Sequence, residues 1–226
     1  MSGDAHYARL VEAASAPYRA AGRFAWHFAR GKLGADPVFP YLLQARLIPE
    51  NARLLDLGCG QGLLAALLAA AGTPRLAGYR GIELMVRDVA RAHRALGAQC
   101  GVRQGDIRSA EFGAADAVVI LDVLHYMSLA EQDAVLGRVR AALPAGGVLL
   151  LRVGDAAAGL PFRLSNWVDW TVAFVRGHGA TRFHCRSVAQ WRSALEALGF
   201  AVQAEPMSRG TPFANVLLSA RLPQSH

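Results

Sequence analysis

Apolar residues along this chain follow two patterns that alternate. Short, nearly continuous apolar runs are typical of buried strands, and apolar positions three and four residues apart are typical of helices. The runs that predict strands are 53–57, 76–83, 99–104, 115–121 and 148–153, then one that begins at 199–202 and a last one at 213–221. The stretches that predict helices between them are 62–71, 86–96, 129–143 and 187–198. This alternation predicts an α/β fold with a doubly wound, mostly parallel sheet.

A helical segment precedes the first predicted strand. Residues 4–30 carry apolar positions at helical spacing, Gly31 and Gly34 interrupt the pattern, and Asp36-Pro37 predicts the cap and first turn of a further helix. The aromatic residues of this segment either pack onto the sheet domain or line a substrate entrance. The expected division is one domain, 1–226, with an N-terminal helical cap at 1–49 and a core at 50–226.

The pattern changes after the fifth predicted strand. Residues 160–176 include Phe162, Trp167, Trp170 and Phe174 with only scattered charge, which predicts one long aromatic helix or two short ones. We expect an insertion at 156–186 that covers the substrate. Packing against a partner subunit is the alternative, and the oligomeric state stays open.

Composition limits the classes of function. The chain has 226 residues, of which 53% are hydrophobic, so it suits one domain with a sizeable core. No stretch reaches the roughly 18 to 20 uncharged apolar residues of a membrane span, and the first residues lack the apolar core of a secretory signal. Cys59, Cys100 and Cys185 are scattered and odd in number, which argues against a disulfide framework or a zinc site. We expect a cytoplasmic protein, and the spacing of the histidines predicts no metal site.

The formal net charge of +7 raises the question of a nucleic-acid partner. Lys32 is the only lysine, so the positive charge is almost entirely arginine, and the arginines are dispersed without a basic run. This pattern favours solvated helix faces over a nucleic-acid site. An acidic protein partner would be attracted by the same charge.

The most informative stretch is LLDLGCGQG at 54–62. An apolar strand ends in Asp56, three alternating glycines follow, and a helical pattern begins at once, so the turn lets a ligand approach backbone N–H groups at a helix N-terminus. A dinucleotide fingerprint would need its third glycine at position 63, where this chain has Leu63. The stretch resembles motif I of the class I S-adenosylmethionine (SAM)-dependent methyltransferases. A structural turn before a helix is the alternative.

The resemblance implies a seven-stranded sheet of order 3-2-1-4-5-7-6 with strand 7 antiparallel, and SAM at the carboxyl ends of the strands, with S-adenosylhomocysteine (SAH) as product. It implies that the glycines approach the methionine portion of SAM, that Asp56 holds its amino group, and that Glu83 accepts both ribose hydroxyls. Asp106 and the backbone of Ile107 would contact the adenine. The full set of implied cofactor residues is Asp56, Gly58, Cys59, Gly60, Gly62, Glu83, Leu84, Asp106, Ile107, Leu121 and Asp122. Two alternatives stay open: Glu83 as a surface acid, and Asp106 as the end of a strand. Cys59 stands where members of this family commonly carry cysteine, so we expect no redox chemistry from it.

Two histidines are candidate catalytic residues. The sulfonium already activates the methyl group, so the protein has mainly to align the acceptor with it. A phenol acceptor benefits from a base, and histidine suits that role. His125 follows the fourth predicted strand, and His184 lies before the helix at 187–198. Either histidine could instead be structural.

The acceptor is predicted from the aromatic insertion and from the tail SRGTPFANVLL at 208–218. Together they resemble the methyltransferases of bacterial aryl-polyene and xanthomonadin-type pigment clusters. That resemblance implies O- or C-methylation of a hydroxyaryl group, carried on an acyl carrier protein in one version. The alternatives are an RNA or protein methyltransferase, and a non-catalytic SAM-fold protein or NAD-binding oxidoreductase.

Overall fold

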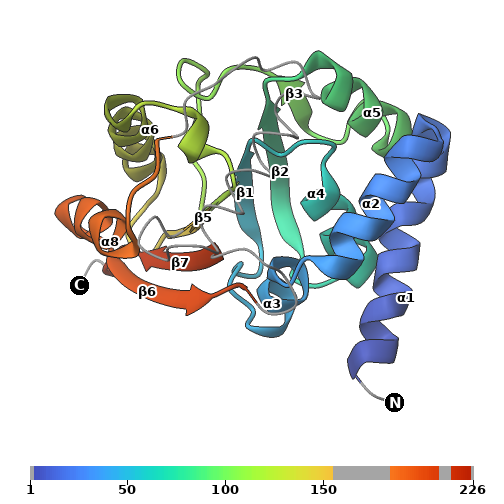
Figure 1. The fold of residues 1–226 in the computed structure, drawn as a ribbon, viewed down its shortest axis with the longest axis horizontal. Coiled ribbons are helices and arrows are strands. Elements are labelled where there is room, and N and C mark those ends of the chain that lie inside the picture. Colours follow the sequence, from blue (N-terminus) through green and yellow to red (C-terminus); the bar gives the residue numbers. More distant parts are fainter. Residues whose placement is uncertain (1–2, 155–183, 209–214, 225–226) are drawn as a thin grey trace. The chain divides into compact units, whose positions relative to one another are not determined.

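The computed structural model describes residues 3–154, 184–208 and 215–224 (Figure 1). The chain divides into two compact units, Met1–Val119 and Ile120–His226. Its strands form one seven-stranded sheet of order β3-β2-β1-β4-β5-β7-β6. This order, with β7 antiparallel, confirms the predicted fold class. The predicted insertion at 156–186 falls almost wholly outside the described residues.

The first unit contains the glycine-rich turn and the strands around it. Its elements after residue 50 are β1 (Ala52–Leu57), α4 (Leu63–Ala71), β2 (Leu76–Glu83), α5 (Val86–Leu96), β3 (Val102–Gln104) and the start of β4 (Ala117–Leu121). β1 pairs with β2 in parallel, with Asp56 opposite Gly81 and Leu57 opposite Ile82. β2 continues in parallel to β3, where Glu83 lies opposite Gln104. The parallel register brings the carboxyl ends of the three strands to one edge of the sheet.

Four helical elements precede β1: α1 (Gly3–Ser15), the 3₁₀ helix η1 (Ala16–Ala21), α2 (Arg23–Ala35) and α3 (Val38–Gln44). The helical prediction for 4–30 is confirmed, but the segment is broken because Pro17 opens η1 and Gly22 adopts a φ of 102°. The prediction that Gly31 and Gly34 end this segment is wrong, since both lie inside α2. An added Cβ at Gly31 would meet nothing within 4 Å, so this glycine is tolerated as an exposed helical position.

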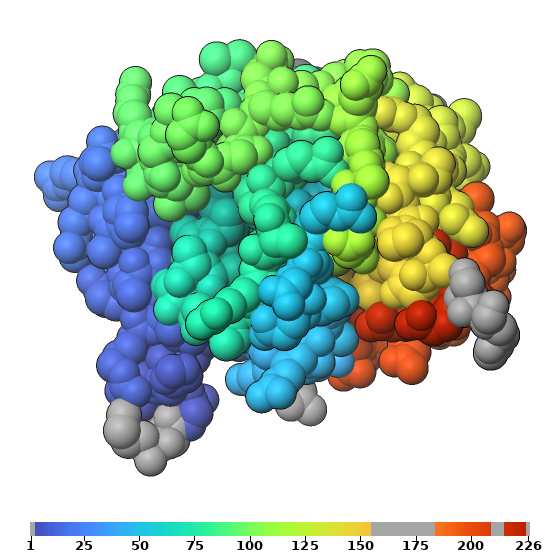
Figure 2. Space-filling view, turned by 180° about the vertical axis from the view of Figure 1, so that it is seen from behind, coloured from blue at the N-terminus to red at the C-terminus, as the bar shows by residue number. Residues whose placement is uncertain are grey.

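The N-terminal helices pack on the same unit's later elements. Figure 2 shows the blue N-terminal residues beside the green residues of α5 and β3. Tyr18 of η1 is fully buried, and the guanidinium of Arg91 in α5 lies 4.8 Å from the centre of the Phe24 ring in α2. Phe24 itself is 61% exposed. Tyr18 thus takes the packing role that the sequence left open for the aromatic residues of the cap.

The second unit is built on an antiparallel set of strands. It holds the end of β4, η2 (Leu124–Tyr126), α6 (Leu129–Ala142), β5 (Val148–Gly154), α8 (Val188–Ala197), β6 (Ala201–Pro206) and β7 (Asn215–Arg221). β7 runs antiparallel to both β5 and β6. α6 and α8 each begin with a capping box, Ser128 with Glu131 and Ser187 with Gln190, which satisfies free N–H groups at both helix starts.

Several predicted boundaries differ from the observed ones. β3 starts at Val102, not at residue 99, because Gly101 has a φ of 77° and its position admits no Cβ, which would lie 2.2 Å from the Tyr79 carbonyl oxygen. The sixth strand begins at Ala201, since Gly199 (φ 86°) turns the chain just before it. The core strands agree well, because their residues are covered on both faces: Val118, Val119 and Ile120 of β4 are fully buried.

Candidate functional site

The glycine-rich turn joins the end of β1 to the start of α4. Gly58, Gly60 and Gly62 have φ values of 74°, 56° and 76°, all in the left-handed region that favours glycine. Gly62 is the N-cap of α4, and an added Cβ there would lie 3.2 Å from Cδ1 of Leu96. The helix has no side-chain cap, so its first N–H groups stay available to a ligand at this turn.

The end of β2 holds this turn in place. The carbonyl oxygen of Ile82 accepts hydrogen bonds from Gly58 N at 2.8 Å and Cys59 N at 3.2 Å. Glu83 is 9% exposed; its Oε2 accepts from Gly60 N and its Oε1 from Met85 N, each at 2.8 Å. Glu83 is therefore a buried acid bonded to the turn, which argues against the reading as a surface acid. Each carboxylate oxygen has a second lone pair, so the group can still accept hydroxyl donors.

Asp56 lies beneath the turn and is 4% exposed. Its Oδ2 accepts a hydrogen bond from the Tyr79 hydroxyl at 2.9 Å. Burial raises the pKa of Asp56 to about 7, with a smaller rise from nearby Glu83 and a partial reduction by the Tyr79 hydrogen bond. This carboxyl is poised between its charged and neutral forms near neutral pH, so a nearby cation would favour the charged form.

Cys59 serves packing. It is 8% exposed and joins a buried cluster with Val89, Ala92 and Val102. Burial, with Asp56 and Glu83 nearby, raises the pKa of the Cys59 thiol well above its ordinary value. A protonated, buried thiol is a poor nucleophile, which agrees with the expectation of no redox chemistry.

Tyr18 was not predicted as part of the site. Its hydroxyl donates to the carbonyl oxygen of Gln61, inside the glycine-rich turn, at 2.7 Å. Gln61 in turn donates through Nε2 to Oδ1 of Asp88 in α5 at 3.2 Å. The turn is thus supported from the N-terminal helices as well as from β2. No local signal could have shown this, because Tyr18 and Gln61 are 43 residues apart in sequence.

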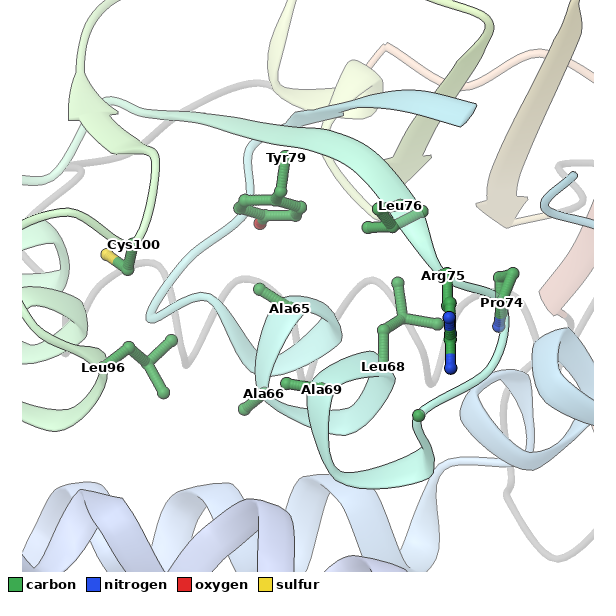
Figure 3. A pocket seen from close by; sticks show the side chains of 11 residues that line it. Ala65, Ala66, Leu68, Ala69, Pro74, Arg75, Leu76, Tyr79, Leu96 and Cys100 are labelled. Carbon is green, nitrogen blue, oxygen red and sulfur yellow. The ribbon is translucent and has the colours of Figure 1, made fainter. Parts of the chain in front are cut away.

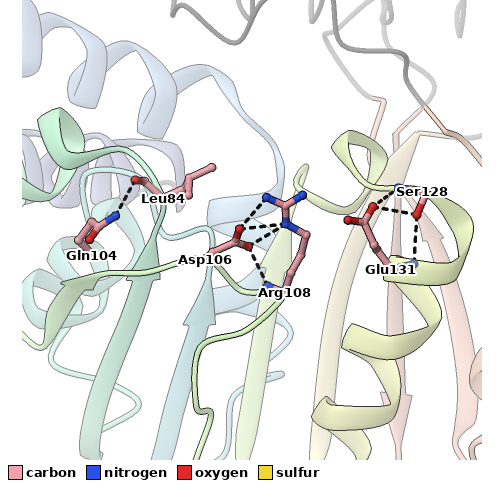
Figure 4. A network of polar contacts seen from close by, with 6 residues as sticks. All are labelled: Leu84, Gln104, Asp106, Arg108, Ser128 and Glu131. Atoms are coloured by element: carbon pink, nitrogen blue, oxygen red, sulfur yellow. Dashed lines mark hydrogen bonds and ion pairs between the residues drawn. The ribbon is translucent and has the colours of Figure 1, made fainter.

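The predicted adenine-contacting residues follow β3 (Figure 4). The carboxylate of Asp106 accepts from the backbone N–H of Arg108 at 2.9 Å and from its guanidinium at 2.6–3.0 Å. These hydrogen bonds from Arg108 lower the pKa of Asp106. Leu84 is 45% exposed and its carbonyl accepts from Gln104, whereas Ile107 is buried. The carbonyl oxygen of Asp106 also accepts from the backbone N–H groups of Ser109 and Ala110, which forms a turn two residues after the end of β3 at Gln104.

In the second unit, Asp122 forms an ion pair with a buried arginine that the sequence did not predict. Leu121 ends β4, and Asp122 has a φ of 59°, unusual for a residue other than glycine. The Arg152 guanidinium binds both oxygens of the Asp122 carboxylate, with Nε to Oδ1 at 2.8 Å. Arg152 is 1% exposed. The one available signal was an arginine within the apolar run of β5.

The structure brings the two candidate catalytic histidines together through the backbone. His184 N donates to the carbonyl oxygen of His125 at 3.0 Å, and Nε2 of Gln132 donates to the carbonyl oxygen of His184 at 2.7 Å. Burial lowers the pKa of His125 to about 4, against a smaller opposing effect of Asp122. His125 is therefore neutral at pH 7 and a weaker base than an exposed histidine.

A separate cavity of about 580 Å³ lies between α4, β2 and the end of α5 in the first unit (Figure 3). Its walls include Ala65, Ala69, Leu76, Tyr79 and Leu96, and its lining is mainly apolar. None of the predicted cofactor residues lines it. We therefore place the candidate cofactor site at the turn and at the end of β2, and not in this cavity.

Within the described ranges, no group of three or more histidine, cysteine, aspartate or glutamate side chains is arranged to hold a metal ion. Among the helices that the structure describes, none combines the length and apolar character of a transmembrane span.

Comparison with known proteins identifies the family. The profile described as "Methyltransferase domain" matches residues 25–205. The chain belongs to the SAM-dependent methyltransferases. In this methyltransferase the match starts within α2 and ends within β6, so it includes the glycine-rich turn and both candidate histidines. The cofactor of the family is SAM.

One curated protein is similar in sequence to this methyltransferase. It is 33% identical over 164 residues to the carboxy-S-adenosyl-L-methionine synthase of Chromohalobacter salexigens, covering 69% of this chain and 58% of that protein. The chain thus spans about three fifths of the length of this curated relative.

Two solved structures share the fold. The magnesium protoporphyrin IX methyltransferase of Synechocystis PCC 6803, with bound SAH, has a TM-score of 0.59 and 21% identity, with 88% of each chain covered. An S-adenosylmethionine-dependent methyltransferase of Mesorhizobium loti has a TM-score of 0.61 and 21% identity, covering 81% of this chain and 96% of that one.

Proposed function

We propose that this methyltransferase transfers the methyl group of SAM to a small hydrophobic or aromatic acceptor that carries a hydroxyl group. The observation that carries the proposal is the turn itself, in which three glycines have left-handed backbones and the N–H of one of them, Gly60, donates to the buried carboxylate of Glu83. Family membership supports the transferred group, and the burial of His125 supports the acceptor class. We take residues 1–226 as one functional domain.

The donor set at the turn fits the chemistry of SAM. Glu83 would hold the ribose hydroxyls, because a carboxylate accepts two charge-assisted hydrogen bonds. Asp56 would attract the amino group, and the backbone at Gly58 and Gly60 would admit the methionine portion closely. Asp106 and Ile107 would contact the adenine. Leu121 and Asp122, in the second unit, are proposed as cofactor residues on the family resemblance alone. SAM supplies a methyl group already activated by its sulfonium, so these residues bind and orient it.

His125 suits a neutral hydroxyaryl acceptor. Its low pKa, caused by burial, keeps the imidazole in the base form throughout the pH range in which the protein would work. A neutral imidazole can accept a hydrogen bond from a phenol and orient its oxygen toward the methyl group. Because the pKa of His125 lies well below that of a phenol, proton transfer to His125 would have to coincide with methylation of the oxygen. A phosphodiester or another charged acceptor would lose hydration in such surroundings without a gain in return, which disfavours RNA. His184 would position the segment that carries His125 through their backbone bond.

A carrier-bound acceptor is the finer version of this proposal. α5 presents the exposed residues Arg87 and Arg94, whereas Asp88, the acidic residue of the helix, is buried. An acidic acyl carrier protein would complement that face. The double variant Arg87→Glu/Arg94→Glu should lower kcat/KM for a hydroxybenzoyl group on a carrier protein and leave the free thioester unaffected. Arg9→Glu, on the exposed side of α1, is the matched control. Equal rates with both forms of the acceptor would refute the carrier.

The free cysteines agree with the reducing cytoplasm that we propose as the compartment of this methyltransferase.

Calorimetry with SAM and SAH, followed by mass spectrometry of reactions with a set of hydroxylated aromatic compounds, tests the function. We expect saturable binding of both nucleosides and an acceptor that gains one methyl group as SAH forms. NAD binding without SAM binding would instead identify an oxidoreductase, and methylated RNA or protein would refute the small acceptor. SAM binding without any product would indicate a non-catalytic SAM-fold protein.

The curated relative suggests a second product to look for, carboxy-SAM. Such a product carries an added carboxylate, which a buried cation would stabilise. The buried guanidinium of Arg152 is already bound at two points by Asp122, which favours methyl transfer. Nucleoside analysis of the same reactions separates the outcomes, because one yields SAH and the other a carboxylated SAM.

A further inference from the structure

The carboxylate of Asp56 has a single hydrogen-bond partner among the described residues. That partner is the Tyr79 hydroxyl, and it binds Oδ2 alone. Burial raises the pKa of the Tyr79 hydroxyl well above its ordinary value, so it is protonated and acts as a donor at neutral pH. The other oxygen of Asp56 stays available for a further donor.

Gly81 makes this contact possible. It lies opposite Asp56 in the pairing of β1 with β2, and it shares one face of β2 with Tyr79, two residues earlier. An added Cβ at Gly81 would lie 3.0 Å from the Tyr79 hydroxyl and 2.6 Å from Sγ of Cys59. The missing side chain therefore leaves the space in which the phenol reaches across to Asp56. Figure 3 shows the ring of Tyr79 beneath β2, on the side of α4.

We propose that Tyr79 is a positioning residue of the cofactor site, whose hydroxyl keeps Asp56 in its carboxylate form and directed to the amino group of SAM. The inference rests on the proposed role of Asp56 in binding that group. A hydrogen bond to the charged form of an acid stabilises that form, and here it opposes the effect of burial. Tyr79 does not contact the reacting atoms; it acts on the cofactor through Asp56.

The groups around Asp56 determine how its charge depends on pH. Glu83 on β2 and Cys59 in the turn surround it, and Tyr18 of η1 adds to the electrostatic surroundings of Tyr79. Burial and the Glu83 carboxylate raise the pKa of Asp56, and Tyr79 provides the hydrogen bond that lowers it. The variant Tyr79→Phe removes the hydroxyl and keeps the ring, so it should leave Asp56 largely protonated at pH 7 in a protein that still folds.

Two measurements on Tyr79→Phe test the proposal: the carbon-13 resonance of the Asp56 carboxyl in the free protein, and the affinity for SAH between about pH 6 and 9. We expect the carboxyl midpoint to move up by about one pH unit. The affinity for SAH should then be roughly fivefold weaker at pH 7 and nearly equal to that of the wild type at pH 9. Asp56→Asn should bind SAH weakly and without this pH dependence, and adding Tyr79→Phe to it should change nothing further.

Tyr7→Phe is the matched control, because it also removes a hydroxyl that donates to a buried acceptor, the carbonyl oxygen of Leu33 at 2.7 Å. It should leave the Asp56 midpoint unchanged. An unchanged midpoint in Tyr79→Phe, or an affinity lowered equally at every pH, would overturn the inference. If Tyr79→Phe does not fold, the wild-type protein provides the test through the chemical shift of the Tyr79 ring carbon that bears the hydroxyl. This shift should change with pH at the midpoint of the Asp56 titration, and a shift independent of pH would refute the role of the contact. Wild-type protein that binds no SAH at any pH would refute the proposed function alone, since the carboxyl titration still tests Tyr79.

Discussion

The change Glu83→Gln tests how the carboxylate holds the glycine-rich turn. In the wild type, the two oxygens of Glu83 accept from Gly60 N and Met85 N, both at 2.8 Å. A glutamine keeps one acceptor and turns its amide NH₂ toward the other backbone donor. Loss of one hydrogen bond to a charged group, with a buried donor left unsatisfied, should lower the free energy of unfolding by about 2–3 kcal/mol. For a chain of this size the melting temperature should fall by about 4–10 °C.

The same change should weaken SAH binding more than it weakens the fold. The ribose hydroxyls would lose a charged acceptor, and we expect Kd to rise at least about tenfold, or roughly 1.4 kcal/mol. Calorimetry below the melting temperature measures this binding, and thermal unfolding measures the stability. The matched control is Glu50→Gln, because Oε2 of Glu50 also accepts from a backbone donor, Arg75 N at 2.9 Å, on the exposed side of the same unit. Wild-type affinity for SAH in Glu83→Gln, with a reduced melting temperature, would show that Glu83 only supports the turn.

Three further predictions concern stability. Gly62→Ala should lower the free energy of unfolding, measured by denaturant titration, by about 1–2 kcal/mol, because Gly62 has a φ of 76°. The control Gly137→Ala, inside α6, should be neutral or slightly stabilising. Equal effects of the two changes would contradict the argument from backbone conformation. Asp122→Ala should cost up to about 3 kcal/mol, because it removes a half-buried carboxylate that pairs with the buried Arg152 guanidinium, and adding Arg152→Met should restore much of the loss in the same assay. Because the pKa of Asp56 is raised in the folded protein, this group lowers the stability of the free protein as pH rises from about 4 to 7, by up to about 4 kcal/mol. The difference in unfolding free energy between wild type and Asp56→Asn should follow that window, and a difference independent of pH would refute it.

Sequence patterns predicted the parts of the fold that local chemistry determines. The bounds of β2 and α5 match the predicted 76–83 and 86–96, because an apolar run, a helical stripe and the C-terminal Gly97 signal them locally. The prediction was wrong at Gly31 and Gly34, because α2 continues through both glycines at exposed positions of the helix.

The candidate site likewise contains residues that the sequence predicted and residues that it did not. Glu83 and the three glycines could be predicted because they follow one another closely at the ends of β1 and β2. Tyr79 and Arg152 could not, since each acts through a partner that only the fold brings near: Asp56 is 23 residues from Tyr79, and Asp122 is 30 residues from Arg152. Tyrosine is found both inside proteins and at their surface, so Tyr79 gave no signal by its type, whereas Arg152 gave only the signal of an arginine within an apolar run.

The segment between residues 154 and 184 is bounded on both sides by main-chain hydrogen bonds. Gly154 pairs with Asn215 in the antiparallel ladder, and the backbone of His184 is held by His125 and Gln132. Most of these bonds use main-chain atoms, which every amino acid possesses, so they can hold the two ends of the segment whatever its sequence. A chimera that exchanges this segment between relatives should therefore keep the proposed SAM site and take the acceptor specificity of the protein that donates the segment.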